Sequence, residues 1–156
     1  MTTLPAVSRV MLSAWRIGTP EVWNPRIEMV LRDGAAAMVA LRDASIARWF
    51  TPDFSAAHPA AAKQITDMLA ATSPEGYAAN CAAVRDADFR EQIADIQSPT
   101  LIVCGSLDPV TTVEHGRFMQ QRIEGAKLVE FHAAHLSNVE IGEAFSRRVL
   151  DFLLAH

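Results

Sequence analysis

The sequence of 156 residues lacks several features that would each define a class of protein. It contains no run of about 18 apolar residues, so no transmembrane helix is expected. Its first twenty residues contain no charged segment followed by an apolar core, so no secretory signal peptide is expected. Only two cysteines are present, Cys81 and Cys104, without the spacing of a disulfide framework. A reducing cytoplasm is therefore the expected location.

The charge of the chain is too small to indicate a polyanionic partner. The formal net charge is −4 and the isoelectric point is near 5.7, which argues against binding to nucleic acid or to an anionic membrane. Half of the residues are apolar and 21% are charged, as in ordinary globular proteins. The length fits one domain, or one lobe of a larger domain.

The distribution of glycine excludes one catalytic motif. The nucleophile turn of many Ser…Asp…His hydrolases has the pattern Gly-x-Ser-x-Gly, which needs two glycines four positions apart. The glycines of this chain stand at positions 18, 34, 76, 105, 116, 125 and 142. Since no two of them have that separation, the sequence contains no such turn.

What is present changes in character at about residue 98. Residues 20–97 are rich in alanine and helical in period, and helices are expected over residues 20–33, 35–49, 59–69 and 74–86. Proline follows Thr19 and Ser73 and also stands at position 59, which is typical of a helix start. Thr51-Pro52 is expected to end the helix over residues 35–49. The helices do not alternate with strands, so they predict a helical insertion. Before them, Val10 is expected near the end of a strand.

The last third of the chain alternates strands and helices. Residues 100–104 form a short apolar run of the kind found in strands buried on both faces, and residues 127–131 are expected to form the next strand. A capping box at Thr111 and Glu114 predicts a helix to about residue 123. A loop is expected over residues 132–138, and a final helix over residues 144–154. Short connections between strand, helix and strand indicate a parallel pair, and hence an α/β fold.

An acid and a histidine follow the two strands. Asp108 comes just after the first apolar run, and His135 comes just after the second. Functional groups collect beyond the carboxyl ends of parallel strands, so both side chains are expected at the same edge of the sheet. A carboxylate beside an imidazole fixes the tautomer of the ring and stabilises the imidazolium. The pair therefore predicts a general base for a hydroxyl nucleophile.

Other interpretations of these residues stay open. Asp108 precedes a proline, as turn-forming aspartates often do, and His135 can be an ordinary loop histidine. Cys104 offers an alternative nucleophile, although it ends a strand and lacks an exposed turn. A metal site is a further alternative, although its spacing differs from that of a helical zinc motif. Its ligands would be His115, His132, His135 and Glu140.

Arginines and a tryptophan in the helical part are candidates for substrate binding. Arginine matches a carboxylate in a bidentate manner, so Arg16 and Arg48 can bind an acidic substrate. Trp49 follows Arg48 directly and can line the same pocket. The alternative is that Trp49 belongs to the core and that the arginines are solvated.

Five segments of the sequence resemble one enzyme family. The chain is similar to the C-terminal part of α/β-hydrolases, and specifically to 3-oxoadipate enol-lactonases. The strand-to-aspartate segment is shared by many α/β-hydrolases, whereas the histidine segment and the Arg-Trp-Phe-Thr-Pro segment are more specific. The similar segments are SPTLIVCGSLD (98–108), AAHLSNVE (133–140), RIGTPE (16–21), RWFTP (48–52) and SPEGY (73–77).

The resemblance implies a fold and a reaction. It implies a partial α/β-hydrolase fold with a residual core strand and loop over 1–18, a helical cap over 19–97, and a C-terminal α/β core lobe over 98–156. The reaction is the opening of 3-oxoadipate enol-lactone in the β-ketoadipate pathway of aromatic catabolism. Asp108 would orient His135, the general base, and Arg16, Arg48 and Trp49 would bind the substrate. No cofactor and no metal are implied.

The missing nucleophile predicts that the chain alone is inactive or very weak. Without neighbouring strands, the segment 100–104 would leave unpaired backbone groups and apolar faces, so association with a second copy or with an N-terminal hydrolase half is expected. The alternative is a non-catalytic remnant or a module that binds a small acid on the same fold.

Overall fold

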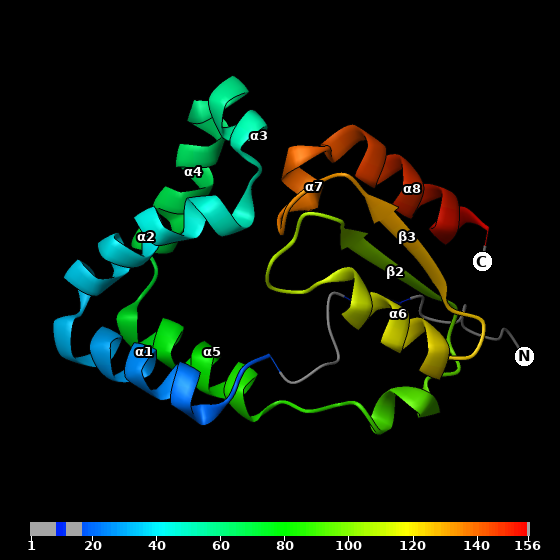
Figure 1. The fold of residues 1–156 in the computed structure, drawn as a ribbon, viewed down its shortest axis with the longest axis horizontal. Helices are drawn as coiled ribbons and strands as arrows, with labels where there is room; N and C mark the ends of the chain where they lie inside the picture. Colours follow the sequence, from blue (N-terminus) through cyan, green and yellow to red (C-terminus); the bar gives the residue numbers. More distant parts are fainter. Residues whose placement is uncertain (1–8, 12–16, 156) are drawn as a thin grey trace, which may run out of the picture. The chain divides into compact units, whose positions relative to one another are not determined.

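The structure is a computed structural model that describes residues 9–11 and 17–155, with the backbone alone for residues 9–11 (Figure 1). The chain divides into two compact units, Arg16–Asp88 and Met1–Trp15 together with Phe89–His156. Each unit is described by itself. Among the residues that the structure describes, none of the helices has the length and apolar character needed to cross a membrane.

The first unit is helical throughout. The helix α1 packs against α5, and α2 packs against α4, as Figure 1 also shows. A hydrogen bond joins α1 and α5: Nη1 of Arg85 in α5 donates to Oδ1 of Asn24 in α1 at 2.7 Å. The five helices are α1 (Pro20–Asp33), α2 (Ala35–Trp49), α3 (Pro52–Ala57), α4 (Pro59–Ala70) and α5 (Pro74–Asp86). A buried core shared by α1, α2 and α5 consists of Val30, Ala37, Met38, Leu41 and Ala78.

Proline determines where these helices begin. The helices α1, α3, α4 and α5 each start with a proline, whose fixed φ suits the first helical position and whose missing N–H costs nothing there. Ser73 caps α5 by accepting a hydrogen bond from the Gly76 N–H at 3.1 Å. The predicted helices are therefore confirmed, whereas α3 was not expected.

The second unit is built on a parallel sheet of three strands in the order β1-β2-β3. The strands are β1 (Arg9–Met11), β2 (Thr100–Gly105) and β3 (Lys127–Phe131). In the register, Val10 pairs with Leu101, and Val103 pairs with Val129. All six residues of β2 are buried, as expected for the central strand of a covered sheet.

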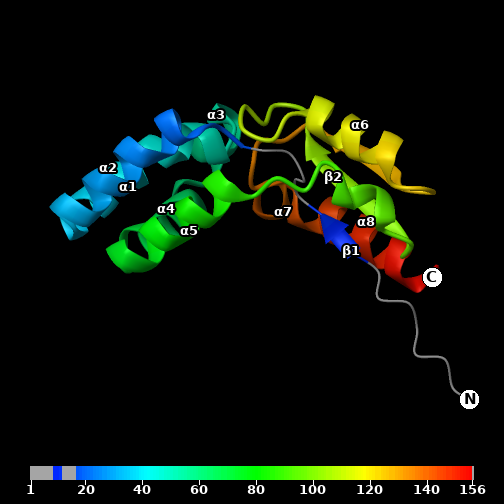
Figure 2. The same ribbon diagram turned by 90° about the horizontal axis from the view of Figure 1, so that it is seen from below.

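Helices cover both faces of this sheet (Figure 2). The side chains of β2 alternate between the faces: Ile102 packs with Met119 and Ile123 around α6 (Val113–Arg122), and Leu101 packs with Phe152 of α8 (Gly142–Leu154). A short 3₁₀-helix, η1 (Gln92–Asp95), also contacts α6. The result is a three-layer α/β/α arrangement, and the predicted α/β class is confirmed.

Two local predictions in this unit are wrong. The helix α6 begins at Val113 with Thr112 as its N-cap, rather than with Thr111. The segment 132–138, expected as a loop, ends in the helical turn α7 (Ser137–Glu140). Both differences add hydrogen-bonding groups near Asp108 and His135. Thr111 contacts Asp108 rather than capping the helix, and Glu140 of α7 contacts the backbone beside His135.

Candidate active site

The structure brings Asp108 and His135 together beyond the carboxyl ends of β2 and β3. The ring Nδ1 of His135 lies 2.8 Å from Oδ2 of Asp108. An ionised carboxylate can only accept a hydrogen bond, so Nδ1 is the donor, and in the neutral ring Nε2 carries the lone pair. The Asp108 side chain is 4% exposed, whereas that of His135 is 30% exposed. The acid is therefore shielded from water while the base remains accessible.

Backbone hydrogen bonds hold the two loops against each other. The N–H of Ser106 donates to the carbonyl of Phe131 at 2.7 Å, and the N–H of Leu107 donates to the carbonyl of Ala133 at 3.1 Å. Gly105 makes this approach possible, since a Cβ there would lie 2.4 Å from the Ala133 carbonyl oxygen. Absence of a side chain at Gly105 is thus a condition for the Asp108–His135 contact.

Both oxygens of Asp108 have fixed donors. Oδ1 accepts the N–H groups of Val110 at 2.7 Å and Thr111 at 3.1 Å, and Oδ2 accepts the Thr111 hydroxyl at 2.6 Å as well as His135. Burial alone would raise the pKa of Asp108. The hydrogen bonds from His135, Thr111 and the Val110 amide outweigh burial and hold this pKa below its usual value. The carboxylate is therefore ionised at neutral pH.

The loop that contains His135 is held from its other side by Glu140. Oε2 of Glu140 accepts a hydrogen bond from the Ala134 N–H at 2.9 Å. Ala133 and Ala134 are both buried, so the backbone on the N-terminal side of His135 is fixed by packing as well. The imidazole thus projects from a supported loop, which is what a positioned base requires.

This arrangement can accept a proton at Nε2 and stabilise the resulting imidazolium through Asp108. In the described part of the chain, the hydrogen-bond partners of the His135 ring are Asp108 and Thr111, and no serine is among them. Over the described residues, the pair therefore combines a carboxylate and an imidazole with no serine hydroxyl bonded to the ring.

Cys104 does not fill that role. It is 5% exposed, and its Sγ lies 2.4 Å from where a Cβ would stand on Gly116 of α6. Burial raises the pKa of its thiol to about 11, and the nearby carboxylates of Glu130 and Asp108 add to the effect. Because the thiolate is the reactive form, the structure argues against Cys104 as a nucleophile.

The residues considered as metal ligands do not converge. Over residues 17–155, no group of three or more histidine, cysteine, aspartate or glutamate side chains is placed to hold a metal ion. Glu140 is engaged with the Ala134 amide, and His135 with Asp108.

The predicted substrate-binding residues lie in the helical unit. Arg48 and Trp49 end α2, and both are half-buried, while Arg16 lies outside the described residues. The Arg48 Nη2 donates to Ser45 Oγ at 3.3 Å, and its Nε is buried without a hydrogen-bond partner among the described residues. A buried guanidinium N–H that lacks an acceptor is costly, and a ligand carboxylate would satisfy it.

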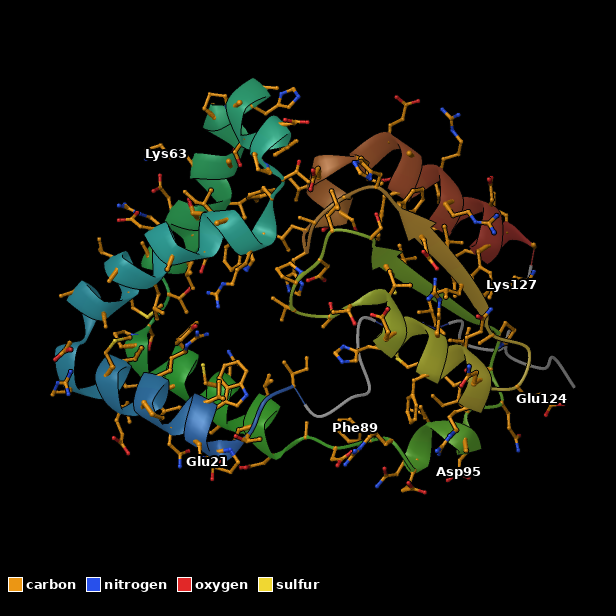
Figure 3. All side chains as sticks on the ribbon, viewed as in Figure 1. Glu21, Lys63, Phe89, Asp95, Glu124 and Lys127 are labelled. Atoms are coloured by element: carbon orange, nitrogen blue, oxygen red, sulfur yellow. The ribbon has the colours of Figure 1, made fainter. Side chains whose placement is uncertain are left out.

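A separate cavity of about 330 Å³ lies between α2 and α4, and it contains none of the predicted site residues. Its charged groups neutralise one another: Lys63, labelled in Figure 3, pairs with Asp67, which also lies 3.7 Å from Arg42. The cavity therefore presents no unpaired charge to a ligand.

The sequence is similar to known proteins over most of its length. The chain is 43% identical over 133 residues to 3-oxoadipate enol-lactonase 1 of Acinetobacter baylyi, a match that covers 85% of the chain and 49% of that protein. It is 36% identical over 137 residues to 3-oxoadipate enol-lactonase 2 of the same organism, covering 88% of the chain and 50% of that protein. No protein-family model matches the sequence.

A solved structure gives the same result for the fold. The crystal structure of the enol-lactonase from Burkholderia xenovorans superposes with a TM-score of 0.87 and 40% identity, over 95% of the chain and 55% of that structure. The chain thus spans about half the length of the relatives that it matches.

The sheet architecture and these matches show that the chain has part of the fold of the α/β-hydrolase superfamily. Within that superfamily its sequence is similar to 3-oxoadipate enol-lactonases, and the shared length is consistent with the C-terminal part of such a protein.

The supporting roles of three residues around the pair were not predicted from the sequence. Gly105, Thr111 and Glu140 act through contacts between two loops, which spacing along the chain does not reveal. The one available signal was the pattern Asp-x-x-Thr at positions 108–111, because a carboxylate at the start of a turn commonly accepts N–H groups two and three residues later.

Proposed function

We propose that this chain is the part of a 3-oxoadipate enol-lactonase-type hydrolase that supplies the acid and the base for opening a lactone ring. The observation that supports the proposal is the 2.8 Å contact between Asp108 and His135, with the carboxylate buried and the imidazole partly exposed. The proposed layout is a core strand and loop over 1–18, a cap over 19–97, and a core lobe over 98–156. The proposed setting is aromatic catabolism in the cytoplasm.

The proposed reaction needs a serine from an N-terminal hydrolase half, whether that half precedes this sequence in one polypeptide or is a separate chain. His135 Nε2 takes the serine proton as the serine oxygen bonds to the lactone carbonyl carbon. The ring C–O bond then breaks, and the leaving oxygen receives the proton from Nε2. His135 then deprotonates a water molecule, whose oxygen bonds to the acyl carbon. The bond to the serine oxygen breaks, and that oxygen takes the proton back from Nε2.

Arg48 and Trp49 are the proposed contacts for the substrate. The unsatisfied Nε–H of Arg48 suits a free carboxylate on the lactone, because a bidentate guanidinium–carboxylate pair would fill two donors at once. Trp49 offers an apolar surface beside it. Arg16 is proposed for the same role from the sequence resemblance alone.

Complementation tests this function. The chain is mixed with the part of the 43% identical Acinetobacter baylyi protein that it does not match, here called the complementing half. Hydrolysis of 3-oxoadipate enol-lactone is then measured by loss of the enol-lactone absorbance. We expect activity from the mixture, little or none from either part alone, and none with His135→Ala.

Two outcomes would count against the proposal. A mixture that forms a complex yet leaves the lactone intact would favour the alternative, a non-catalytic module on the same fold. Association of two copies of this chain, with no affinity for the complementing half, would contradict the proposed partner and favour a homo-oligomer.

A further inference from the structure

Thr111 contacts both oxygens of the Asp108 carboxylate. Its backbone N–H donates to Oδ1 at 3.1 Å, and its hydroxyl donates to Oδ2 at 2.6 Å. The other donors each reach a single oxygen: Val110 contacts Oδ1, and His135 contacts Oδ2. Two bonds from one residue to the two ends of a carboxylate restrict its rotation, which a donor at one end cannot do.

The Thr111 hydroxyl matters because its hydrogen bond to Asp108 lies in a buried position. Asp108 is 4% exposed at its side chain, so water cannot readily replace a donor that is lost. The Thr111 oxygen also lies 3.5 Å from Nδ1 of His135, so it stands beside both members of the pair. Removal of the hydroxyl would leave Oδ2 with His135 as its remaining donor.

We propose that Thr111 is a positioning residue for the acid–base pair, whose hydroxyl fixes the plane of the Asp108 carboxylate so that Oδ2 faces Nδ1 of His135. The ring is thereby kept in the tautomer with Nδ1 protonated and Nε2 free. The consequence for catalysis rests on the proposed function, whereas the effect on the tautomer does not.

The neighbouring Thr112 is a matched control. It lies in the same loop as the N-cap of α6, and the contacts described around Asp108 and His135 do not include it. Thr111→Val retains the backbone donor and the shape of the side chain while it removes the hydroxyl. Thr111→Ser restores the hydroxyl, and Thr112→Val makes the same chemical change one residue away.

The test is imidazole ¹⁵N NMR on the full chain, with the rate of Nδ1 proton exchange measured for each variant. The wild type, Thr111→Ser and Thr112→Val should show the Nδ1-protonated ring with a protected proton. Thr111→Val should show a mixture of tautomers and an exchange rate raised by about tenfold or more, the factor expected when a hydrogen bond to a charged group is lost. If Thr111→Val does not fold, Thr111→Ala is measured with the same expectation.

Three results would overturn the proposal. Exchange in Thr111→Val that is unchanged or slower would mean that the hydroxyl merely competes with His135 for Oδ2. Equal changes in Thr111→Val and Thr112→Val would mean general loosening of the loop, and failure of Thr111→Ser to restore protection would mean that the hydroxyl is not responsible. Since none of these readouts requires lactone hydrolysis, failure of the proposed function is detected separately.

Discussion

Gly105, the last residue of β2, lies directly beneath the carbonyl groups of the loop that contains His135. A Cβ at this position would stand 2.4 Å from the oxygen of Ala133 and 2.5 Å from the oxygen of Ala134. Those backbone atoms cannot withdraw as a flexible side chain can. The distance between the loops of Asp108 and His135 is therefore set in part by the absence of one methyl group.

Gly105→Ala should separate these loops. We expect destabilisation by about 1–3 kcal/mol, the usual range for overpacking, measured as the free energy of unfolding in urea. Gly142→Ala, where nothing lies within 4 Å of the added methyl group at the start of α8, is the control and should be neutral or slightly stabilising. Equal stability of Gly105→Ala and the wild type would contradict the described approach of the loops.

Acid should weaken the fold through Asp108. Its pKa is lowered in the folded state, so its stabilising contribution is complete above the unfolded-state pKa of about 3.9 and is lost as the pH falls through the folded value. The stability advantage of the wild type over Asp108→Asn should thus shrink between about pH 5 and pH 2. Asp151→Asn, at an exposed position on α8, is the control for loss of a charge. A constant difference across this pH range would argue against the hydrogen-bonded carboxylate.

The two cysteines should resist alkylation in the folded protein. Both are buried, and burial raises the pKa of each thiol, that of Cys104 to about 11. Iodoacetamide at pH 8 should label neither residue until urea unfolds the chain, as followed by mass spectrometry. Rapid labelling of Cys104 in the native chain would restore it as a candidate nucleophile.

Arg48→Met should weaken substrate binding in the mixture of the chain with its complementing half. The loss of a charge-assisted hydrogen bond predicts a KM that rises about 10- to 100-fold while kcat stays close to that of the wild type. Arg32→Met is the control, because Arg32 is 71% exposed and already paired with Asp33. An unchanged KM for the lactone would remove Arg48 from the binding site.

The helices were largely predictable because their signals are local. Proline at the first helical position located the starts of α1, α4 and α5. The same signal at Thr51 and Pro52 was taken only as the end of α2, although the Thr51 hydroxyl accepts the Phe54 N–H at 3.2 Å and begins α3. A six-residue helix has too little apolar period of its own to be recognised.

The acid–histidine pair was predictable for a topological reason, and its surroundings were not. Parallel strands place their carboxyl ends at one edge, so Asp108 and His135 were expected there together. Thr111 was assigned to a helix cap because Glu114 stands three residues later. Its hydroxyl donates to the buried carboxylate of Asp108 instead, because that acceptor is charged and adjacent. Which acceptor the Thr111 hydroxyl bonds to depends on the tertiary structure, and a local sequence pattern does not carry that information.

The most direct test of the central claim is labelling with a fluorophosphonate serine probe, mapped by mass spectrometry. The account predicts no stoichiometric label on this chain alone, and a label on the serine of the complementing half that appears with wild-type chain and is lost with His135→Ala. A stoichiometric label on a serine within residues 17–155, in the absence of any partner, would contradict the account, because the chain would then contain its own nucleophile.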